Sequence, residues 1–161
     1  MKTLFLVRHG KSSNSLTLDD KERPLTERGI NDINHIAVRV ETILPKNFTI
    51  WSSTAKRAHD TALTFAKSIA FPIEKIIFKK ELYCFTVIEL EKIIKSCPNN
   101  CNNLILFGHN EAISIFVNKF GNKLIDHVPT AGLVVLEFET NDWSKIEKGK
   151  TLKTLFPKNL N

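Results

Sequence analysis

Short apolar runs alternate with longer amphipathic segments along this chain, and this alternation constrains the fold more than any other feature. Each apolar run is followed by a segment whose apolar residues recur at helical spacing. Strand, helix, strand, helix, repeated four times, predicts an α/β fold: a three-layer sandwich in which a mostly parallel central sheet has helices on both faces. We interpret four runs as buried strands: 3–7, 48–51, 76–78 and 104–107.

Helix-start signals follow each of these runs. Thr26 is placed to cap the first helix, and Thr86 opens a capping box for the third. The segment 52–54 and Asn110 supply cap candidates for the other two helices. Two further strands are expected, the second of them at the edge of the sheet: 133–138 and 151–156.

The length of 161 residues suits one domain, spanning 1–161, with a full hydrophobic core. With 42% apolar and 25% charged residues, the composition is that of a globular protein in water. No apolar run approaches the roughly 20 residues that a membrane helix needs. Arg8 and His9 interrupt the apolar start of the chain before it reaches the length of a signal-peptide core, so we expect a cytoplasmic protein.

Cysteine usage and charge argue against further classes of site. Cys84, Cys97 and Cys101 cannot all pair within the chain, and no nearby histidine completes a zinc set, so we expect free thiols. The net charge of +6 comes from scattered lysines and arginines without a basic run. Nucleic-acid binding is therefore not expected.

The residues that carry chemistry follow the predicted strands, and in sheets of this type ligands bind outside the carboxyl ends of the strands. Arg8 and His9 follow the first strand, Glu81 lies just past the third, and His109 lies just past the fourth. Arg57 lies one turn into the helix after the second strand. One edge of the sheet is therefore predicted to gather two histidines, two arginines and a glutamate.

These side chains are suited to phosphoryl transfer. Guanidinium groups bind phosphate oxygens bidentately, and helix N-termini add backbone donors. Nearby positive charge disfavours imidazolium, so His9 is predicted to be neutral and able to attack phosphorus. Arg8, Arg57 and His109 would stabilise the charge that develops on the oxygens. A metal site at the two histidines is disfavoured, because carboxylate or thiolate ligands are lacking nearby and the arginines would repel a cation.

Four segments resemble the motifs of the histidine phosphatase superfamily, which includes the cofactor-dependent phosphoglycerate mutases. Leu6-Val7-Arg8-His9-Gly10 resembles its signature, and Pro24-Leu25-Thr26-Glu27-Arg28-Gly29 resembles its L-T-x-x-G helix start. The segment 52–62 is similar to S-S-P-x-x-R-A-x-x-T-A, with Thr54 where proline is usual. Gly108-His109-Asn110 resembles the strand end that supplies the second histidine. The four matches keep the family's order and spacing.

The resemblance implies that the fold is that of the phosphoglycerate mutases and that His9 takes up the phosphoryl group. It implies a pocket formed by Arg8, Arg57 and His109, and a reaction without a metal or an organic cofactor. Two further candidate phosphate-binding residues follow in the same segment: Gly10 and Ser12.

Glu81 occupies the place where many members of the superfamily carry the acid that protonates the leaving oxygen. It is equally consistent with a surface residue at a strand end, and both interpretations stay open. His59 and Asp60 face away from Arg57 on the predicted helix, so we expect them outside the pocket. His127 is expected to have a loop role near the pocket.

Within the superfamily, the short chain and the segment 8–13 most resemble the SixA-type phosphohistidine phosphatases. This resemblance implies phosphohistidine on a protein as the substrate, with a phosphorelay domain as one candidate partner. One alternative is a general phosphatase of small phosphomonoesters. The other, from a different class, is a module that binds phosphoproteins without catalysis.

Overall fold

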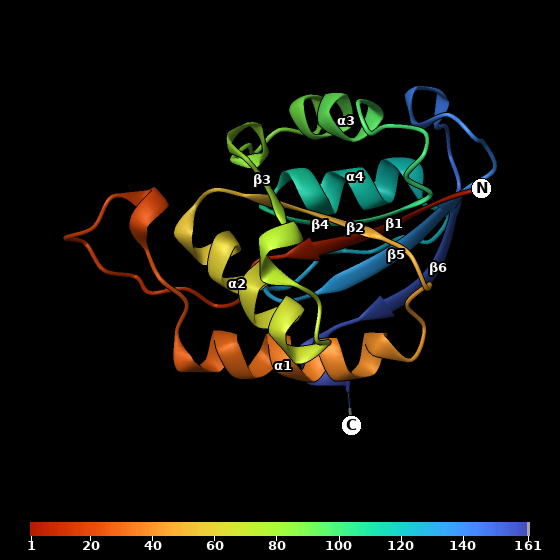
Figure 1. Ribbon diagram of the computed structural model, residues 1–161. Coiled ribbons are helices and arrows are strands. Elements are labelled where there is room, and N and C mark those ends of the chain that lie inside the picture. The colour runs from red at the N-terminus through yellow and green to blue at the C-terminus, as the bar shows by residue number, and fades with distance from the viewer. Residues whose placement is uncertain (161) are drawn as a thin grey trace.

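A six-stranded sheet runs through the middle of the computed structural model, which describes residues 1–160 (Figure 1). Its order is β3-β2-β4-β1-β5-β6. The first four strands are parallel, β5 is antiparallel to β1, and β6 is antiparallel to β5. The predicted mostly parallel sheet is therefore confirmed. The strands are β1 (Lys2–Arg8), β2 (Thr49–Ser53), β3 (Ile77–Lys79), β4 (Asn103–Gly108), β5 (Leu133–Phe138) and β6 (Lys150–Leu155).

Four helices cover the two faces of this sheet, which confirms the three-layer sandwich. In Figure 1, α3 and α4 lie above the sheet, and α1 and α2 lie on the opposite side. In the described part of the chain, no helix is long and apolar enough to cross a membrane. The helices are α1 (Glu27–Glu41), α2 (Lys56–Ser68), α3 (Val87–Lys95) and α4 (Ala112–Phe120).

Two of the four predicted helix starts are confirmed by hydrogen bonds. The Thr26 hydroxyl accepts a hydrogen bond from the Gly29 amide at 3.1 Å and caps α1. The Thr86 hydroxyl accepts from the Glu89 amide at 3.3 Å and donates to the Glu89 carboxylate at 2.8 Å. These side chains satisfy amides that have no partner within their own helix.

The other two helix starts differ from the sequence prediction. The cap residue of α2 is Ala55 rather than a residue of the segment 52–54, and the Ser53 hydroxyl accepts from the Ala55 amide. The cap residue of α4 is Glu111, while the Asn110 side chain reaches one turn further and accepts from the Ser114 amide. In both cases a predicted residue, Ser53 or Asn110, lies just before the cap residue and accepts a hydrogen bond from an amide at the start of the helix.

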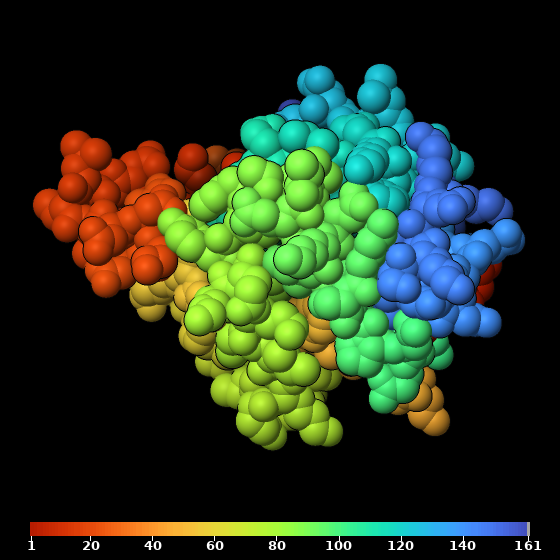
Figure 2. Space-filling view, turned by 90° about the horizontal axis from the view of Figure 1, so that it is seen from above, coloured from red at the N-terminus to blue at the C-terminus, as the bar shows by residue number. Residues whose placement is uncertain are grey.

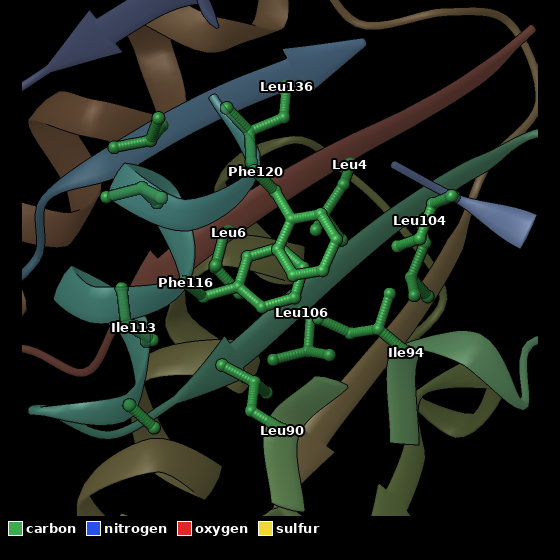
Figure 3. Close-up of a cluster of buried hydrophobic side chains, with 14 of the residues drawn as sticks. Leu4, Leu6, Leu90, Ile94, Leu104, Leu106, Ile113, Phe116, Phe120 and Leu136 are labelled. Atoms are coloured by element: carbon green, nitrogen blue, oxygen red, sulfur yellow. The ribbon is translucent and has the colours of Figure 1, made fainter. Parts of the chain in front are cut away.

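The central strand β1 divides its apolar side chains between two cores, as alternation along a strand requires. Leu4 and Leu6 pack against α3 and α4, in the cluster that Figure 3 shows. Phe5 and Val7 pack against α1 and α2. Because both faces of β1 are fully covered, its register against its neighbours is fixed.

The register between β1 and β4 places the two ends that carry histidine side by side. Arg8 is paired with Gly108, so His9 and His109 are the next residues on adjacent parallel strands. The segment 11–25 then leaves β1 and projects past this end of the sheet before α1 begins (Figures 1 and 2).

Candidate active site

A pocket of about 530 Å³ lies at the carboxyl ends of β1 and β4, where the sequence predicts that the reactive side chains gather. The rings of His9 and His109 are 5.3 Å apart in it. Arg8 and Arg57 reach the same pocket from β1 and from the first turn of α2. Its lining residues are Arg8, His9, Lys11, Ser12, Asn14, Asp20, Arg23, Arg57, Phe85, His109, Asn110 and Thr130.

Hydrogen bonds define which ring nitrogen of His9 carries its proton. His9 Nδ1 lies 2.8 Å from the carbonyl oxygen of Gly10, which can only accept, so the proton is on Nδ1. On the other side of the ring, the Arg57 Nε–H group donates to His9 Nε2 at 3.3 Å. His9 Nε2 therefore presents a lone pair within the pocket.

His9 is held in its neutral form by its surroundings. Burial lowers its pKa from 6.5 to about 4, and the positive charges of Arg57, Arg8 and Arg23 act in the same direction. The hydrogen bond to Gly10 opposes this shift only in part. At neutral pH the imidazole is uncharged, as a nitrogen nucleophile must be.

His109 is positioned by a hydrogen bond to Ser53, the last residue of β2. Its Nε2 atom lies 2.8 Å from the Ser53 hydroxyl, which also accepts from the Ala55 amide. Burial, followed by the electrostatic effects of His9 and Arg57, lowers the pKa of His109 to about 3, so this ring is also neutral. Within residues 1–160, its buried Nδ1 atom has no hydrogen-bond partner.

The two arginines reach the pocket with different partners. Arg8 donates to the Val128 carbonyl at 3.0 Å and lies 3.1 Å from His127 Nε2, while its buried Nε has no partner in the described residues. Arg57, only 3% exposed, donates to the backbone carbonyl of Asp20 at 2.6 Å and to its carboxylate at 2.9 Å. The contact between Arg8 and His127 puts that loop histidine at the rim of the pocket.

Asp20 is a charged site residue that the sequence analysis missed. Besides Arg57, its carboxylate accepts hydrogen bonds from the Arg23 guanidinium at 2.8 Å and from the Tyr83 hydroxyl. The hydrogen bond from Tyr83, followed by those from the two arginines, holds the pKa of Asp20 well below its usual range. A permanent negative charge therefore occupies the fork of Arg57, where an anionic ligand would bind.

We expect the Asp20→Asn variant to bind inorganic phosphate about fivefold more tightly, because the ligand no longer competes with a carboxylate for Arg57. Isothermal titration calorimetry measures this change directly. Asp19→Asn is the matched control, because it removes the same charge from the neighbouring residue, whose side chain makes none of the described hydrogen bonds or ion pairs. Weaker phosphate binding in the Asp20 variant would instead show that Asp20 positions Arg57 for the ligand.

The other predicted residues are distributed inside and outside this pocket. Ser12 lines it, whereas the Gly10 amide is already bound to the Thr61 hydroxyl at 3.0 Å. Gly10 still matters there, because a Cβ atom at this position would lie 3.0 Å from a backbone oxygen of α1. Glu81 is exposed and lines a different pocket, beside α3. His59 stacks on Phe78, away from the site.

The donor set of the pocket fits a phosphate dianion. Two guanidinium groups are donors whose charge and planar geometry match phosphate oxygens. Residues 1–160 contain no group of three or more histidine, cysteine, aspartate or glutamate side chains placed to hold a metal ion.

A model of the histidine phosphatase superfamily (branch 1) matches residues 4–82 of this sequence. The matched region runs from β1 to the turn after β3 and contains Arg8, His9 and Arg57. The fold then brings His109 to the same pocket from beyond the matched region. The chain belongs to the histidine phosphatase superfamily. The family predicted from four sequence segments is confirmed.

Solved structures similar to this histidine phosphatase share its fold over nearly the whole chain. The protein histidine phosphatase SixA, in a structure with tungstate, has a TM-score of 0.81 at 17% identity, with 99% of each chain covered. A protein provisionally named as the phosphohistidine phosphatase SixA of Agrobacterium tumefaciens has a TM-score of 0.79 at 22% identity, covering 96% of this chain and 97% of that one. A mycobacterial glucosyl-3-phosphoglycerate phosphatase has a TM-score of 0.67 at 12% identity, covering 94% and 97%.

These structural similarities establish the fold of the histidine phosphatase and leave its substrate open. The structures include proteins named for protein histidine and for glucosyl-3-phosphoglycerate, all at low identity. A search of curated protein sequences found no match. The substrate must therefore be argued from the pocket itself.

Proposed function

We propose that this protein is a phosphatase that takes a phosphoryl group onto His9 Nε2, and that its substrate is phosphohistidine on another protein. The observation that carries the proposal is the tautomer of His9. The Gly10 carbonyl keeps the proton on Nδ1, so the lone pair of Nε2 lies beside the Arg57 guanidinium. A phosphate bound by that guanidinium would have its phosphorus atom within reach of the nucleophile.

The reaction has two displacements. His9 Nε2 forms a bond to phosphorus while the bond from phosphorus to the substrate nitrogen breaks, and the leaving imidazole takes up a proton from solvent. Arg8 and Arg57 stabilise the charge on the phosphoryl oxygens. If Ser53 donates to Nε2 of His109, the proton of that neutral ring lies on Nδ1 and adds a third donor. Water then attacks the phosphohistidine and releases inorganic phosphate.

The acid–base properties of the pocket favour a nitrogen leaving group over an alkoxide. An alkoxide needs a protonated acid close to the leaving oxygen. Asp20, the carboxylate that lines this pocket, is ionised and bound to two arginines and Tyr83. Glu81 lines a different pocket. Imidazole leaves more readily than an alkoxide and does not require a committed acid.

The surroundings of the pocket favour a protein substrate. The projecting segment 11–25 contributes Lys11, Ser12 and Asn14 to the lining, and it also carries the fully exposed Leu16 and the exposed Leu18. These two apolar side chains are available to pack against a protein substrate. A small phosphomonoester bound in the pocket would not reach Leu16 or Leu18, which do not line it.

The test is a substrate panel. Purified protein is expected to remove phosphate from a phosphorylated histidine domain much faster than from alkyl phosphates of small size, and to carry acid-labile phosphate on His9 after rapid quenching. Rapid hydrolysis of alkyl phosphates with intact phosphohistidine proteins would support the small-molecule phosphatase instead. Tight binding of phosphoproteins without phosphate on His9 would support a binding module.

We expect His9 to titrate at about pH 4 rather than 6.5, because burial and three arginines disfavour its charged form. The neutral ring is the nucleophile, so protonation of His9 lowers kcat/KM. We expect this effect to be absent down to about pH 5 and to reach about tenfold per pH unit below pH 4. The titration of the His9 ring is followed by NMR, with its signals assigned from the His9→Ala variant. Titration near pH 6.5 would contradict the neutral, buried environment.

A further inference from the structure

The end of the sheet opposite the active site carries a second group of reactive side chains. Lys2 is the first residue of β1, Thr49 is the first residue of β2, and Cys101 lies two residues before β4. Because these strands are parallel and adjacent, their N-terminal ends meet. Thr49 and Cys101 line a separate pocket of about 410 Å³ there, and Cys97 is buried in the core next to it.

Lys2 brings a buried positive charge to this cluster. It is 0% exposed, and its ammonium donates to the Asn99 carbonyl at 2.7 Å, the Cys101 carbonyl at 3.2 Å and the Asn102 side-chain oxygen at 2.9 Å. All three acceptors are neutral, and Lys2 takes part in none of the ion pairs formed by residues 1–160. A buried charge without a counter-ion is unfavourable, so a neighbouring group that can become an anion is favoured in that form.

Cys101 is the group that can become that anion. The Cys97 thiol and the Thr49 hydroxyl lie within reach of its sulfur atom, which is 3.3 Å from the Asn103 carbonyl oxygen, and the charge of Lys2 lies nearby. Led by the contact with Cys97, these contacts lower the pKa of Cys101 to about 6 against the opposing effect of burial. The same contact raises the pKa of Cys97, so Cys101 loses its proton more readily than Cys97 does.

The loop from Cys97 to Cys101 is built to keep the two sulfur atoms together. The Cys101 amide donates to the Pro98 carbonyl at 3.0 Å, which closes a tight turn. Trp143 holds the loop from outside, because its indole donates to the Cys101 carbonyl and its amide donates to the Asn99 side chain at 2.9 Å. Lys2 binds the same two residues. The two cysteines thus share one anchored turn.

We propose that Cys101 and Cys97 form a peroxide-reactive dithiol, with Cys101 as the attacking thiolate and Cys97 as the resolving thiol. The Cys101 thiolate attacks one oxygen of a hydroperoxide, the O–O bond breaks, hydroxide or alkoxide leaves, and Cys101 becomes a sulfenic acid. The Cys97 thiol then attacks that sulfur atom, a disulfide forms and water is released. The two thiols supply the two electrons that reduce the peroxide.

Cys84 provides an internal control for this proposal. It is buried in the same hydrophobic cluster, and burial raises its pKa to about 11. It has none of the donors that surround Cys101. A thiol of this kind is expected to be inert towards peroxide while the protein is folded.

The test treats the reduced, folded protein with equimolar hydrogen peroxide, then denatures it in the presence of N-ethylmaleimide and maps the labelled peptides by mass spectrometry. The wild type and Cys84→Ser are expected to lose two alkylatable thiols to a disulfide between Cys97 and Cys101. Cys97→Ser is expected to stop at a sulfenic acid on Cys101, which dimedone traps. Cys101→Ser is expected to keep both remaining thiols free.

The role of Lys2 is tested by the rate at which iodoacetamide labels Cys101 in the folded protein. Lys2→Met is expected to slow labelling about tenfold and Lys2→Arg to preserve it, while all variants label equally when denatured. Three free thiols after peroxide treatment, a disulfide that includes Cys84, or equal labelling of Lys2→Met and wild type would each overturn the proposal. These readouts are independent of phosphatase activity.

Discussion

Replacing His9 by alanine is expected to reduce turnover of a phosphohistidine substrate by about 10⁴-fold or more, as removal of a nucleophile does in other covalent catalysts. The variant lacks the imidazole whose Nε2 atom accepts a hydrogen bond from Arg57. Rapid-quench experiments with ³²P-labelled substrate measure both the rate and the loss of acid-labile phosphate on the enzyme. Retention of enzyme-bound phosphate in this variant would move the nucleophile to another residue.

His59→Ala is the matched control for this experiment. His59 lies on α2 close to the site in sequence, but it stacks on Phe78 and does not line the pocket. Its removal is expected to leave turnover within about twofold of the wild type, as for surface substitutions away from a site. A large loss in this control would mean that α2 itself had moved.

Replacing Arg57 has the second largest expected effect. Arg57→Ala is expected to lower kcat/KM by about 10³-fold, because a buried donor to the phosphoryl oxygens and to His9 is lost. Arg57→Lys is expected to recover only part of this loss, since an ammonium keeps the charge but lacks the planar fork. Steady-state kinetics with the phosphohistidine substrate, together with thermal unfolding to confirm the folded state, measure both effects.

Arg28→Ala controls for the loss of an arginine elsewhere. Arg28 is exposed on α1 and forms only a long surface ion pair with Asp32, at 3.6 Å. Its removal should change neither kcat/KM nor phosphate binding measurably.

If Arg57→Lys matched the wild type, the positive charge alone would suffice, and a bidentate role of the Arg57 guanidinium would be excluded.

The sheet and the histidines could be predicted from the sequence because both depend on local patterns. Buried strands produce continuous apolar runs, and the residue after such a run in a parallel sheet must lie at the ligand-binding edge. His9 and His109 follow two runs that proved to be adjacent strands. Arg57 lies in the first turn of α2, which begins at Lys56, rather than one turn into the helix, and it still lines the pocket.

Asp20 and Tyr83 could not be predicted in the same way, because their positions depend on loops. Asp20 reaches Arg57 only because the projecting segment folds back over the pocket, and nothing periodic in that segment indicates this path. The nearest signal was Arg23, directly before the Pro24 motif, whose side chain binds both Asp20 and the Ser13 carbonyl.

Glu81 shows where the strand-end rule loses its accuracy. The strand β3 is three residues long and lies at the edge of the sheet, and the turn after it is a 3-10 turn. That turn buries Leu82 and leaves Glu81 on the outside, so Tyr83 is the residue that reaches the active site. The residue that faces the site is therefore Tyr83, two positions after the carboxylate that the strand-end rule predicted.

The position of β1 in the middle of the sheet also governs how the protein is made. β1 is synthesised first, yet its partners β4 and β5 lie roughly a hundred residues or more downstream. Until they emerge from the ribosome, the backbone edges of β1 are unpaired and its apolar faces are only partly covered, and such states are prone to aggregation. The same delay keeps His9 and His109 apart, so a nascent chain acquires its pocket only when most of the sequence has been translated.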